Sequence, residues 1–290
     1  MAEIKFGPSG KGEIFYKEGF LHTTDMPIFL KNHGLDCFEY SFGRGYTMSA
    51  QTAKEIGDAC KQKQILISAH APYYINFAQE NEQSVEKSFK YVLDGLKMLE
   101  YFGGQRLVVH PASCGKMKRE FAFELTKKRF ADLAERVKNF PYIKDKFICP
   151  ETMGKTLQIG TYKEVVDICS LSDKFLPCFD FGHINSVTFG GLKIADDYNK
   201  IFDYCNEKLG EFRTKNCHIH FSKIEFGAKG ELRHLDFSST QFGPDFSVLA
   251  DVIVKRDLTP YVICESKDFM VEDAITMKKM YENALKLNKI

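Results

Sequence analysis

Eight short apolar runs, each rich in β-branched and aromatic residues, recur along the chain and constrain its fold more than any other feature. They occupy residues 4–9, 37–42, 65–70, 106–111, 146–151, 175–180, 216–221 and 261–266. Continuous apolar runs of roughly four to eight residues are typical of parallel strands that are buried on both faces. In a chain of 290 residues the runs recur about every 36 residues, which leaves room for one helix after each strand.

Helical patterns fill several of the intervals. Between residues 81 and 102 the apolar side chains keep a three-and-four spacing, and Gly103 is predicted to stop that helix. Thr161 and Glu164 form a capping-box pattern, and residues 248–253 keep helical spacing before Pro260. Eight strand–helix units predict one (β/α)8 TIM barrel of the α/β class, a single domain over residues 1–290. A doubly wound open sheet is the alternative that this pattern leaves open.

Composition excludes several classes of protein. The chain is 44% hydrophobic and 27% charged, as in ordinary globular proteins, so we do not expect disorder. It has no apolar stretch long enough to span a membrane and no signal-peptide pattern, so we expect a cytoplasmic protein without a membrane partner. The net charge of +1 does not indicate a basic nucleic-acid-binding face, although bound cations or a local patch would be hidden in that sum. The nine cysteines form no C-x-x-C pair, so we expect buried thiols and no cysteine zinc site.

Polar residues at the carboxyl ends of the predicted strands are the main functional signal. They are His70, His110, Glu151, Asp180, His183 just after the sixth strand, His218 in the seventh, and Glu265. In a (β/α)8 barrel these side chains converge on the mouth where active sites are built. One such histidine is commonly a hydrogen-bonded structural residue, and one such carboxylate can simply cap the next helix. Several together are costly to bury without cations, so the pattern predicts a site for more than one metal ion.

Three further residues have open assignments. His220 lies two residues after His218 and points to the same side of its strand, so it can bind a metal or orient its neighbours. Glu231 and His234 lie in a polar segment after the seventh strand, and both can reach over the mouth.

The chain resembles the endonuclease IV family of abasic-site DNA repair enzymes, which are trinuclear-zinc (β/α)8 barrels. The resemblance is carried by the stretches SAHAPYYINFA, VVHPAS, PETMGKTLQIG, CFDFGHINSVTFGG, HIHFSKIEFG and VICES. It implies up to three zinc ions, with Mn²⁺ or Fe²⁺ as alternatives at some sites. The resemblance implies three ligand sets. The first contains His70, His110 and Glu151, and the second contains Asp180, His218, Glu265 and the same Glu151. The third contains His183 and His234.

Two departures from the family pattern concern the third set and the seventh strand. The family places an aspartate two residues before the last histidine, but Leu232 occupies that position here. Glu231 is the nearest carboxylate, and Asp236 is another possible substitute. The family's H-x-N-D stretch corresponds to residues 218–221, which read HIHF.

The resemblance also implies an activity and a partner. The activity is hydrolysis of the phosphodiester 5′ to an abasic site in double-stranded DNA, which leaves a 3′-hydroxyl, by a protein that acts as a monomer. Glu151 would be the catalytic, bridging carboxylate. Tyr73 matches an aromatic position that contacts damaged DNA, and Arg44 resembles a DNA-inserting arginine. An exposed loop residue without that role is the alternative for both.

Two other functions remain open from the sequence. A xylose-isomerase-like sugar isomerase or epimerase needs one divalent metal held by Glu151, Asp180, His218 and Glu265, for which the other histidines are surplus. A catalytically inactive barrel that binds damaged DNA or a phosphorylated ligand is the third reading, suggested only by the missing aspartate.

Overall fold

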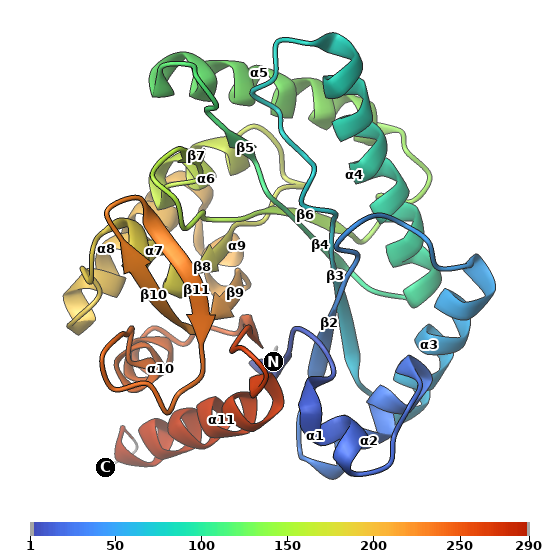
Figure 1. Cartoon of the computed structure of the whole chain (residues 1–290), viewed down its shortest axis with the longest axis vertical. Helices are drawn as coiled ribbons and strands as arrows, with labels where there is room; N and C mark the ends of the chain where they lie inside the picture. Colours follow the sequence, from blue (N-terminus) through green and yellow to red (C-terminus); the bar gives the residue numbers. More distant parts are fainter. Residues whose placement is uncertain (1–2, 289–290) are drawn as a thin grey trace.

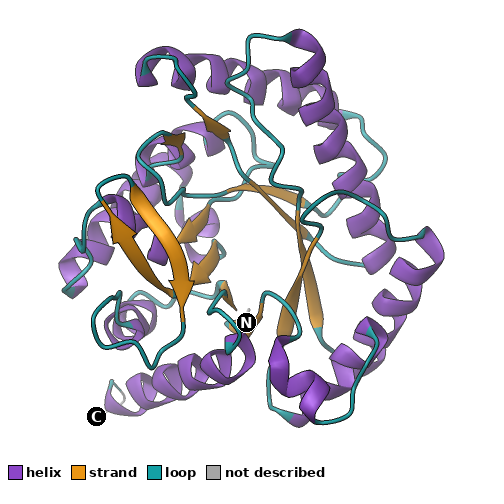
Figure 2. Ribbon diagram, in the orientation of Figure 1, coloured by secondary structure: helices purple, strands orange, loops and turns teal. Residues whose placement is uncertain are grey.

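Parallel strands form a barrel surrounded by helices in the computed structural model, which describes residues 3–288 (Figures 1 and 2). The hydrogen-bonded strand orders are β1-β12-β9-β8 and β2-β3-β4-β6. The barrel strands are β1 (Lys5–Pro8), β2 (Cys37–Ser41), β3 (Leu66–His70), β4 (Arg106–Val109), β6 (Phe147–Pro150), β8 (Cys178–Asp180), β9 (His218–Phe221) and β12 (Tyr261–Cys264). Each of the eight apolar runs contains one of these strands, which confirms the predicted (β/α)8 barrel.

The two half-barrels meet at two seams. Isolated parallel bridges pair Ile148 with Phe175 and Glu151 with Cys178, which joins β6 to β8. At the other seam the amide of Asp36 donates to the carbonyl of Phe6 at 2.9 Å, and β1 lies against β2. A Cβ on Gly7 would lie 1.7 Å from the carbonyl oxygen of Cys37, so only glycine allows this approach.

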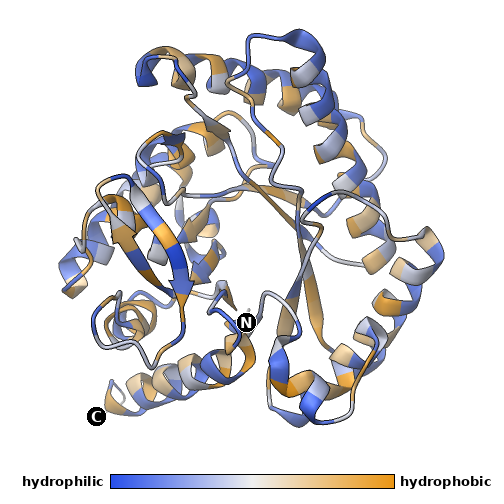
Figure 3. Ribbon diagram, in the orientation of Figure 1, coloured by the Kyte–Doolittle hydropathy of each residue, from blue (hydrophilic) through white to orange (hydrophobic). Residues whose placement is uncertain are grey.

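Helices surround the barrel, with hydrophobic and hydrophilic residues alternating along them (Figure 3). Their buried residues pack on the strands in one large apolar core. The helices are α1 (Gly12–Lys17), α2 (Met26–Asn32), α3 (Ala50–Lys63), α4 (Glu82–Phe102), α5 (Arg119–Lys138), α6 (Tyr162–Cys169), α7 (Phe181–Val187), α8 (Ala195–Leu209), α9 (Glu211–Lys215), α10 (Phe246–Lys255) and α11 (Met270–Leu287), with a 3₁₀ turn, η1 (Thr23–Asp25).

Helix ends follow the sequence signals. The side chain of Asn81 caps α4 by accepting from the Ser84 amide, and α4 stops at Gly103, whose φ of 68° favours glycine. Both hydrogen bonds of the predicted capping box at Thr161 and Glu164 are present at the start of α6. Within residues 3–288, no helix is both long and apolar enough to cross a membrane.

Two small antiparallel pairs lie outside the barrel. Strand β5 (Ala112–Ser113) pairs with β7 (Gln158–Ile159), and β10 (Lys223–Gly227) pairs with β11 (Gly230–Leu235). The β10–β11 hairpin follows β9 directly and packs against α7 (Figure 1). It therefore brings a second layer of side chains to the carboxyl-terminal end of the barrel.

Candidate metal centre

A cavity of about 410 Å³ opens at the carboxyl ends of the barrel strands. It is lined by residues from six barrel-strand ends or the loops after them and from the β10–β11 hairpin. Its ionisable lining residues include His70, His110, Glu151, Lys155, His183, Glu231, His234 and Glu265. Five of the seven residues predicted at strand ends, His70, His110, Glu151, His183 and Glu265, therefore line one hollow, whereas Asp180 and His218 are buried outside its lining.

The first group of metal-capable side chains is His70, His110 and Glu151, whose ligand atoms all lie within 4.8 Å of one another. Nε2 of His70 and Nε2 of His110 each lie 3.1 Å from the same oxygen, Oε2 of Glu151. Nδ1 of His70 lies 2.7 Å from the carbonyl of Ala71, so this nitrogen donates and Nε2 is left to face the cavity.

The second group is Glu151, Asp180, His220 and Glu265, whose ligand atoms again lie within 4.8 Å of one another. Glu151 is therefore common to two groups. Asp180 is the N-cap of α7: its Oδ1 accepts from the His183 amide at 2.7 Å. Its other oxygen, Oδ2, is buried and has no hydrogen-bond partner. A buried carboxylate oxygen that accepts no hydrogen bond is what we expect of an atom that binds a cation.

His220, and not His218, belongs to the second group. In the pairing of β8 with β9, His220 lies level with Asp180, whereas His218 lies level with Cys178, two residues deeper in the barrel. Nδ1 of His220 is 3.1 Å from Oε1 of Glu151. The geometry therefore brings His220, and not the predicted His218, together with Glu151, Asp180 and Glu265, and His218 lies deeper in the barrel.

The third group is His183, Glu231 and His234. Nε2 of His183 lies 3.6 Å from Oε2 of Glu231, and Nε2 of His234 lies 3.6 Å from Oε1 of the same carboxylate. His183 is oriented by its Nδ1, 2.9 Å from the carbonyl of Thr152. The hydroxyl of Ser222 contacts Nδ1 of His234 at 2.8 Å, which leaves Nε2 of His234 for the cavity.

A β-bulge brings Glu231 into this group. Arg233 pairs with Glu225 and Glu231 pairs with Phe226, so Leu232 has no partner across the hairpin. The Leu232 side chain is 63% exposed. The extra residue lets Glu231 and His234, three positions apart, point to one side of the strand, as residues two apart would in a regular strand.

Gly154 allows the third group to close. A Cβ at this position would lie 2.7 Å from Cδ2 of His183 and 2.8 Å from Oε2 of Glu231. The carbonyl of Gly154 also accepts from the Glu231 amide and from the Ser186 hydroxyl, both at 2.8 Å. The same residue thus fixes the distance between the hairpin, α7 and the loop after Glu151.

Burial and the neighbouring charges perturb the pKa values of these groups. Burial alone would raise the pKa of Glu151, but the surrounding imidazoles hold it well below its ordinary value. Burial lowers the pKa of His110. For His183 burial opposes protonation, but Asp180 and other carboxylates outweigh it and raise the pKa to about 9. The site therefore combines an ionised central carboxylate with imidazoles whose protonation depends on their nearest charges.

The rim of the cavity is more sparsely charged. Tyr73 lines the cavity, is 52% exposed and packs on Tyr74 with ring centroids 4.3 Å apart. Arg44 lies in the loop between β2 and α3, outside the cavity lining. Lys155, which carries no expectation from the sequence, lines the cavity. The sequence feature that could have indicated Lys155 is its position four residues after Glu151, in the loop that follows that strand.

Comparison with known proteins identifies relatives over most of the chain. A family model described as a xylose isomerase-like TIM barrel matches residues 28–285. An uncharacterized protein of Methanocaldococcus jannaschii is 31% identical over 253 residues, which cover 87% of this chain and 89% of that protein. A protein of Mycoplasmoides gallisepticum named "probable endonuclease 4" is 28% identical over 199 residues, which cover 67% of this chain and 62% of that relative.

Solved structures share the fold at lower identity. A D-tagatose 3-epimerase-like protein superposes with a TM-score of 0.70 at 18% identity and covers 98% of each chain. Endonuclease IV from Thermus thermophilus superposes with a TM-score of 0.64 at 16% identity, again over 98% of each chain. The named relatives and neighbours are thus endonucleases and epimerases, two kinds of enzyme built on the same barrel.

Proposed function

The chain belongs to the xylose isomerase-like TIM barrel family, and we propose that it is a metal-dependent endonuclease that acts on abasic sites in duplex DNA. Its similarity to relatives named as probable endonuclease 4 supports this proposal. It would hydrolyse the phosphodiester 5′ to the lesion and leave a 3′-hydroxyl. The observation that carries the proposal is the set of three groups of imidazoles and carboxylates around one cavity, two of which share Glu151.

The donor atoms fit borderline divalent cations, zinc foremost and Mn²⁺ or Fe²⁺ as alternatives. Imidazole nitrogens and carboxylate oxygens are the ligands that these ions take in proteins. The unpartnered Oδ2 of Asp180 and the two Nε2 atoms directed at one oxygen of Glu151 support this fit. Cations held there would polarise a phosphate and make a nearby water more acidic.

Each group would hold one ion, and the first two groups would share Glu151. His70 and His110 would hold one ion, and Glu151 would bridge it to a second held by Asp180, His220 and Glu265. The third ion would be held by the remaining residues of the mouth, which are His183, Glu231 and His234. Glu151 is the catalytic residue in this assignment because its two oxygens face both of the first two groups.

Substrate selection would depend on the size and rim of the cavity. A volume of about 410 Å³ is in the range of small-molecule sites and suits one extruded sugar phosphate. Extrusion of a nucleotide costs least where no base is paired, which favours an abasic site over an intact one. Tyr73 offers an exposed aromatic face at the rim, and Lys155 and Arg44 offer charges for DNA phosphates.

The competing function is sugar epimerisation at one metal ion. The second group alone would suffice for that chemistry, and the first and third groups would then have no purpose. Substitution of Glu231 distinguishes the two functions, because Glu231 belongs only to the third group, which an epimerase with one metal ion does not need. Its matched control is Glu225 in the partner strand of the same hairpin, which pairs with Arg233 at the surface and lies outside all three groups.

The test is incision of a duplex oligonucleotide with one abasic site by zinc- or manganese-loaded protein, before and after chelator treatment. We expect chelator-sensitive cutting on the 5′ side with a 3′-hydroxyl end. Glu231→Gln should reduce the rate at least roughly tenfold, as loss of a metal ligand or of its support does elsewhere, and Glu225→Gln should leave it unchanged. Absence of incision by the folded, metal-loaded protein, together with epimerisation of a ketose, would overturn the proposal in favour of the epimerase.

A further inference from the structure

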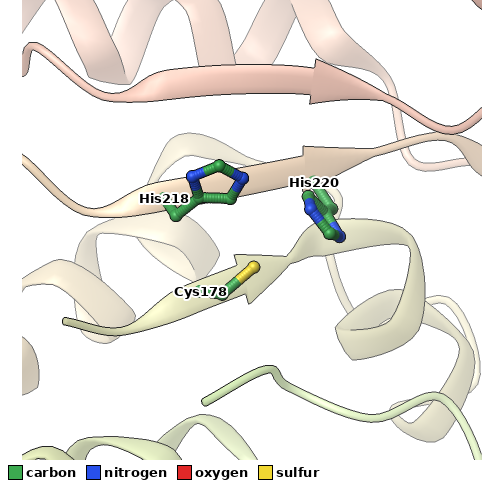
Figure 4. A group of neighbouring side chains, drawn as sticks. All are labelled: Cys178, His218 and His220. Atoms are coloured by element: carbon green, nitrogen blue, oxygen red, sulfur yellow. The ribbon is translucent and has the colours of Figure 1, made fainter. Parts of the chain in front are cut away.

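Four polar side chains meet inside the barrel, beneath the mouth. They are Glu39 on β2, Cys178 on β8, and His218 and His220 on β9, and all are buried. Figure 4 shows both imidazole rings on β9 and the sulfur of Cys178 on the face of β8 that is turned toward them. Barrel interiors are normally filled by branched apolar residues, so this group needs a physical explanation.

The distances between the donor atoms are close to those of a tetrahedral metal site. The ligand atoms of Cys178, His218 and His220 all lie within 4.8 Å of one another. Oε2 of Glu39 lies 3.1 Å from Nε2 of His218, and Oε1 lies 2.9 Å from Nε2 of His220. The bond lengths of tetrahedral zinc imply separations of roughly 3.3–3.8 Å between ligand atoms. Only small movements of these side chains would be needed to bind an ion.

The donor atoms are not satisfied by one another. Oε1 of Glu39, Nε2 of His218 and Nε2 of His220 are buried without a hydrogen-bond partner, although the carboxylate oxygens and the nitrogens are only 2.9–3.1 Å apart. Their distances allow hydrogen bonds, so it is their orientation that fails. Buried polar atoms that lack partners are costly, and a cation between them would remove that cost.

The carboxylate is held in place from its other side. The hydroxyl of Ser68 on β3 donates to Oε2 of Glu39 at 2.8 Å, which fixes the plane of the carboxylate and leaves Oε1 free. A hydrogen bond of this kind behind a ligand is a common feature of metal sites in proteins.

We propose that Glu39, Cys178, His218 and His220 form a buried binding site for a zinc-class divalent cation, which shares only His220 with the three groups at the mouth. Four protein ligands from three strands would leave no open position for substrate, so the ion would be structural. Cys178 would bind as thiolate and release its proton. Burial raises the pKa of this thiol, and direct coordination by a cation reverses that preference.

His220 would connect the buried site to the mouth. Its Nε2 faces Glu39, whereas its Nδ1 lies 3.1 Å from Oε1 of Glu151 and 3.5 Å from Oε1 of Glu265. If both sites are filled at once, the ring loses both of its protons and bridges two ions. The buried ion would then fix the orientation of a mouth ligand.

Cobalt substitution tests the buried site in the whole protein, because a cysteine thiolate bound to Co²⁺ gives a charge-transfer band in the near ultraviolet. Among the described residues, the metal-capable groups at the mouth contain no cysteine. The band therefore reports on Cys178 and not on the proposed endonuclease site. We expect cobalt-loaded wild-type protein to show the band, and Cys178→Ser to lose it together with one equivalent of bound cobalt.

Two variants make the outcome specific. Cys149→Ser changes another fully buried barrel cysteine that lies outside these groups, and it should keep both the band and the cobalt content. Glu231→Gln at the mouth should also keep the band, even if incision is lost. Absence of the band from cobalt-loaded wild-type protein, or its persistence in Cys178→Ser, would overturn the proposal whether or not the protein cuts DNA.

Discussion

Gly154→Ala tests whether the third group at the mouth is a metal site, because it perturbs that group without removing a ligand. The added Cβ would lie 2.7 Å from Cδ2 of His183 and 2.8 Å from Oε2 of Glu231, whereas ordinary contact begins at 3.4 Å. The two side chains would have to retreat by about 0.6–0.7 Å, the difference between these distances. Ligand positions in metal sites are set to within about 0.2 Å, so this displacement is large.

The expected magnitude follows from this displacement. Inserting one methyl group into a packed site typically costs about 1–3 kcal/mol, and the strain here falls on two of the three ligands. Misplacing ligands in this way should weaken binding at the third group by roughly 10- to 100-fold, as loss of ligand-orienting contacts does in other metal sites. The first two groups lie on other residues and should keep their ions.

The assay is metal content per chain during titration with a competing chelator, with incision measured on the same samples. We expect Gly154→Ala to lose one equivalent at a lower chelator concentration than wild type and to lose incision in parallel. Gly10→Ala is the control, because its Cβ would meet only the flexible end of Met270, at 3.1 Å from the sulfur. An unchanged metal count and affinity in Gly154→Ala would refute the assignment of a metal to the third group.

Four more outcomes are expected. Asp180→Asn keeps an N-cap for α7 but removes a negative charge, so it should fold normally and lose one metal equivalent and incision, as metal analysis and the cutting assay would report. Thr161→Ala removes the cap of α6, so chemical denaturation should show a loss of about 1 kcal/mol with activity unchanged. All nine cysteines are buried and burial raises the pKa of Cys60, Cys149 and Cys264 to about 12, so a thiol reagent should label none before unfolding and nine after it. The same shifts imply that stability falls as pH rises above about 9, where unfolded thiols ionise and folded ones do not, which denaturation curves at about pH 8 and 10 would check.

The barrel could be predicted from the sequence because each strand is a short apolar run, and most of these runs are closed by a polar residue. Asp180, for example, is expected either to cap a helix or to face a metal, and in the structure one of its oxygens caps α7 while the other is left for a cation. The position of a residue at the end of a strand can be recognised from the local sequence. In a barrel of parallel strands, all carboxyl ends lie on the same side. The convergence of these residues on one cavity follows from the fold.

The depth of a side chain in the barrel could not be predicted. His218 and His220 point to the same side of β9, and only the pairing of His220 with Asp180 decides which of them reaches the mouth. Glu231 reaches the third group through a bulge at Leu232, which depends on the pairing of two strands and not on spacing along one. Glu39 escapes sequence reasoning because it lies within an apolar run, although a carboxylate in a strand buried on both faces is itself a signal.

The seam between the first and last strands has a consequence for synthesis of the protein. Lys5 pairs with Tyr261, so the barrel closes only after the 255 residues between them have left the ribosome. Contacts of such sequence separation form late in folding. Glu265, next to the last strand, completes the second group only at that stage, so a nascent chain would carry most of the ligands in an open, incomplete cavity. If the proposed ions bind at the mouth, the second group can be filled only after the last strand has joined the barrel.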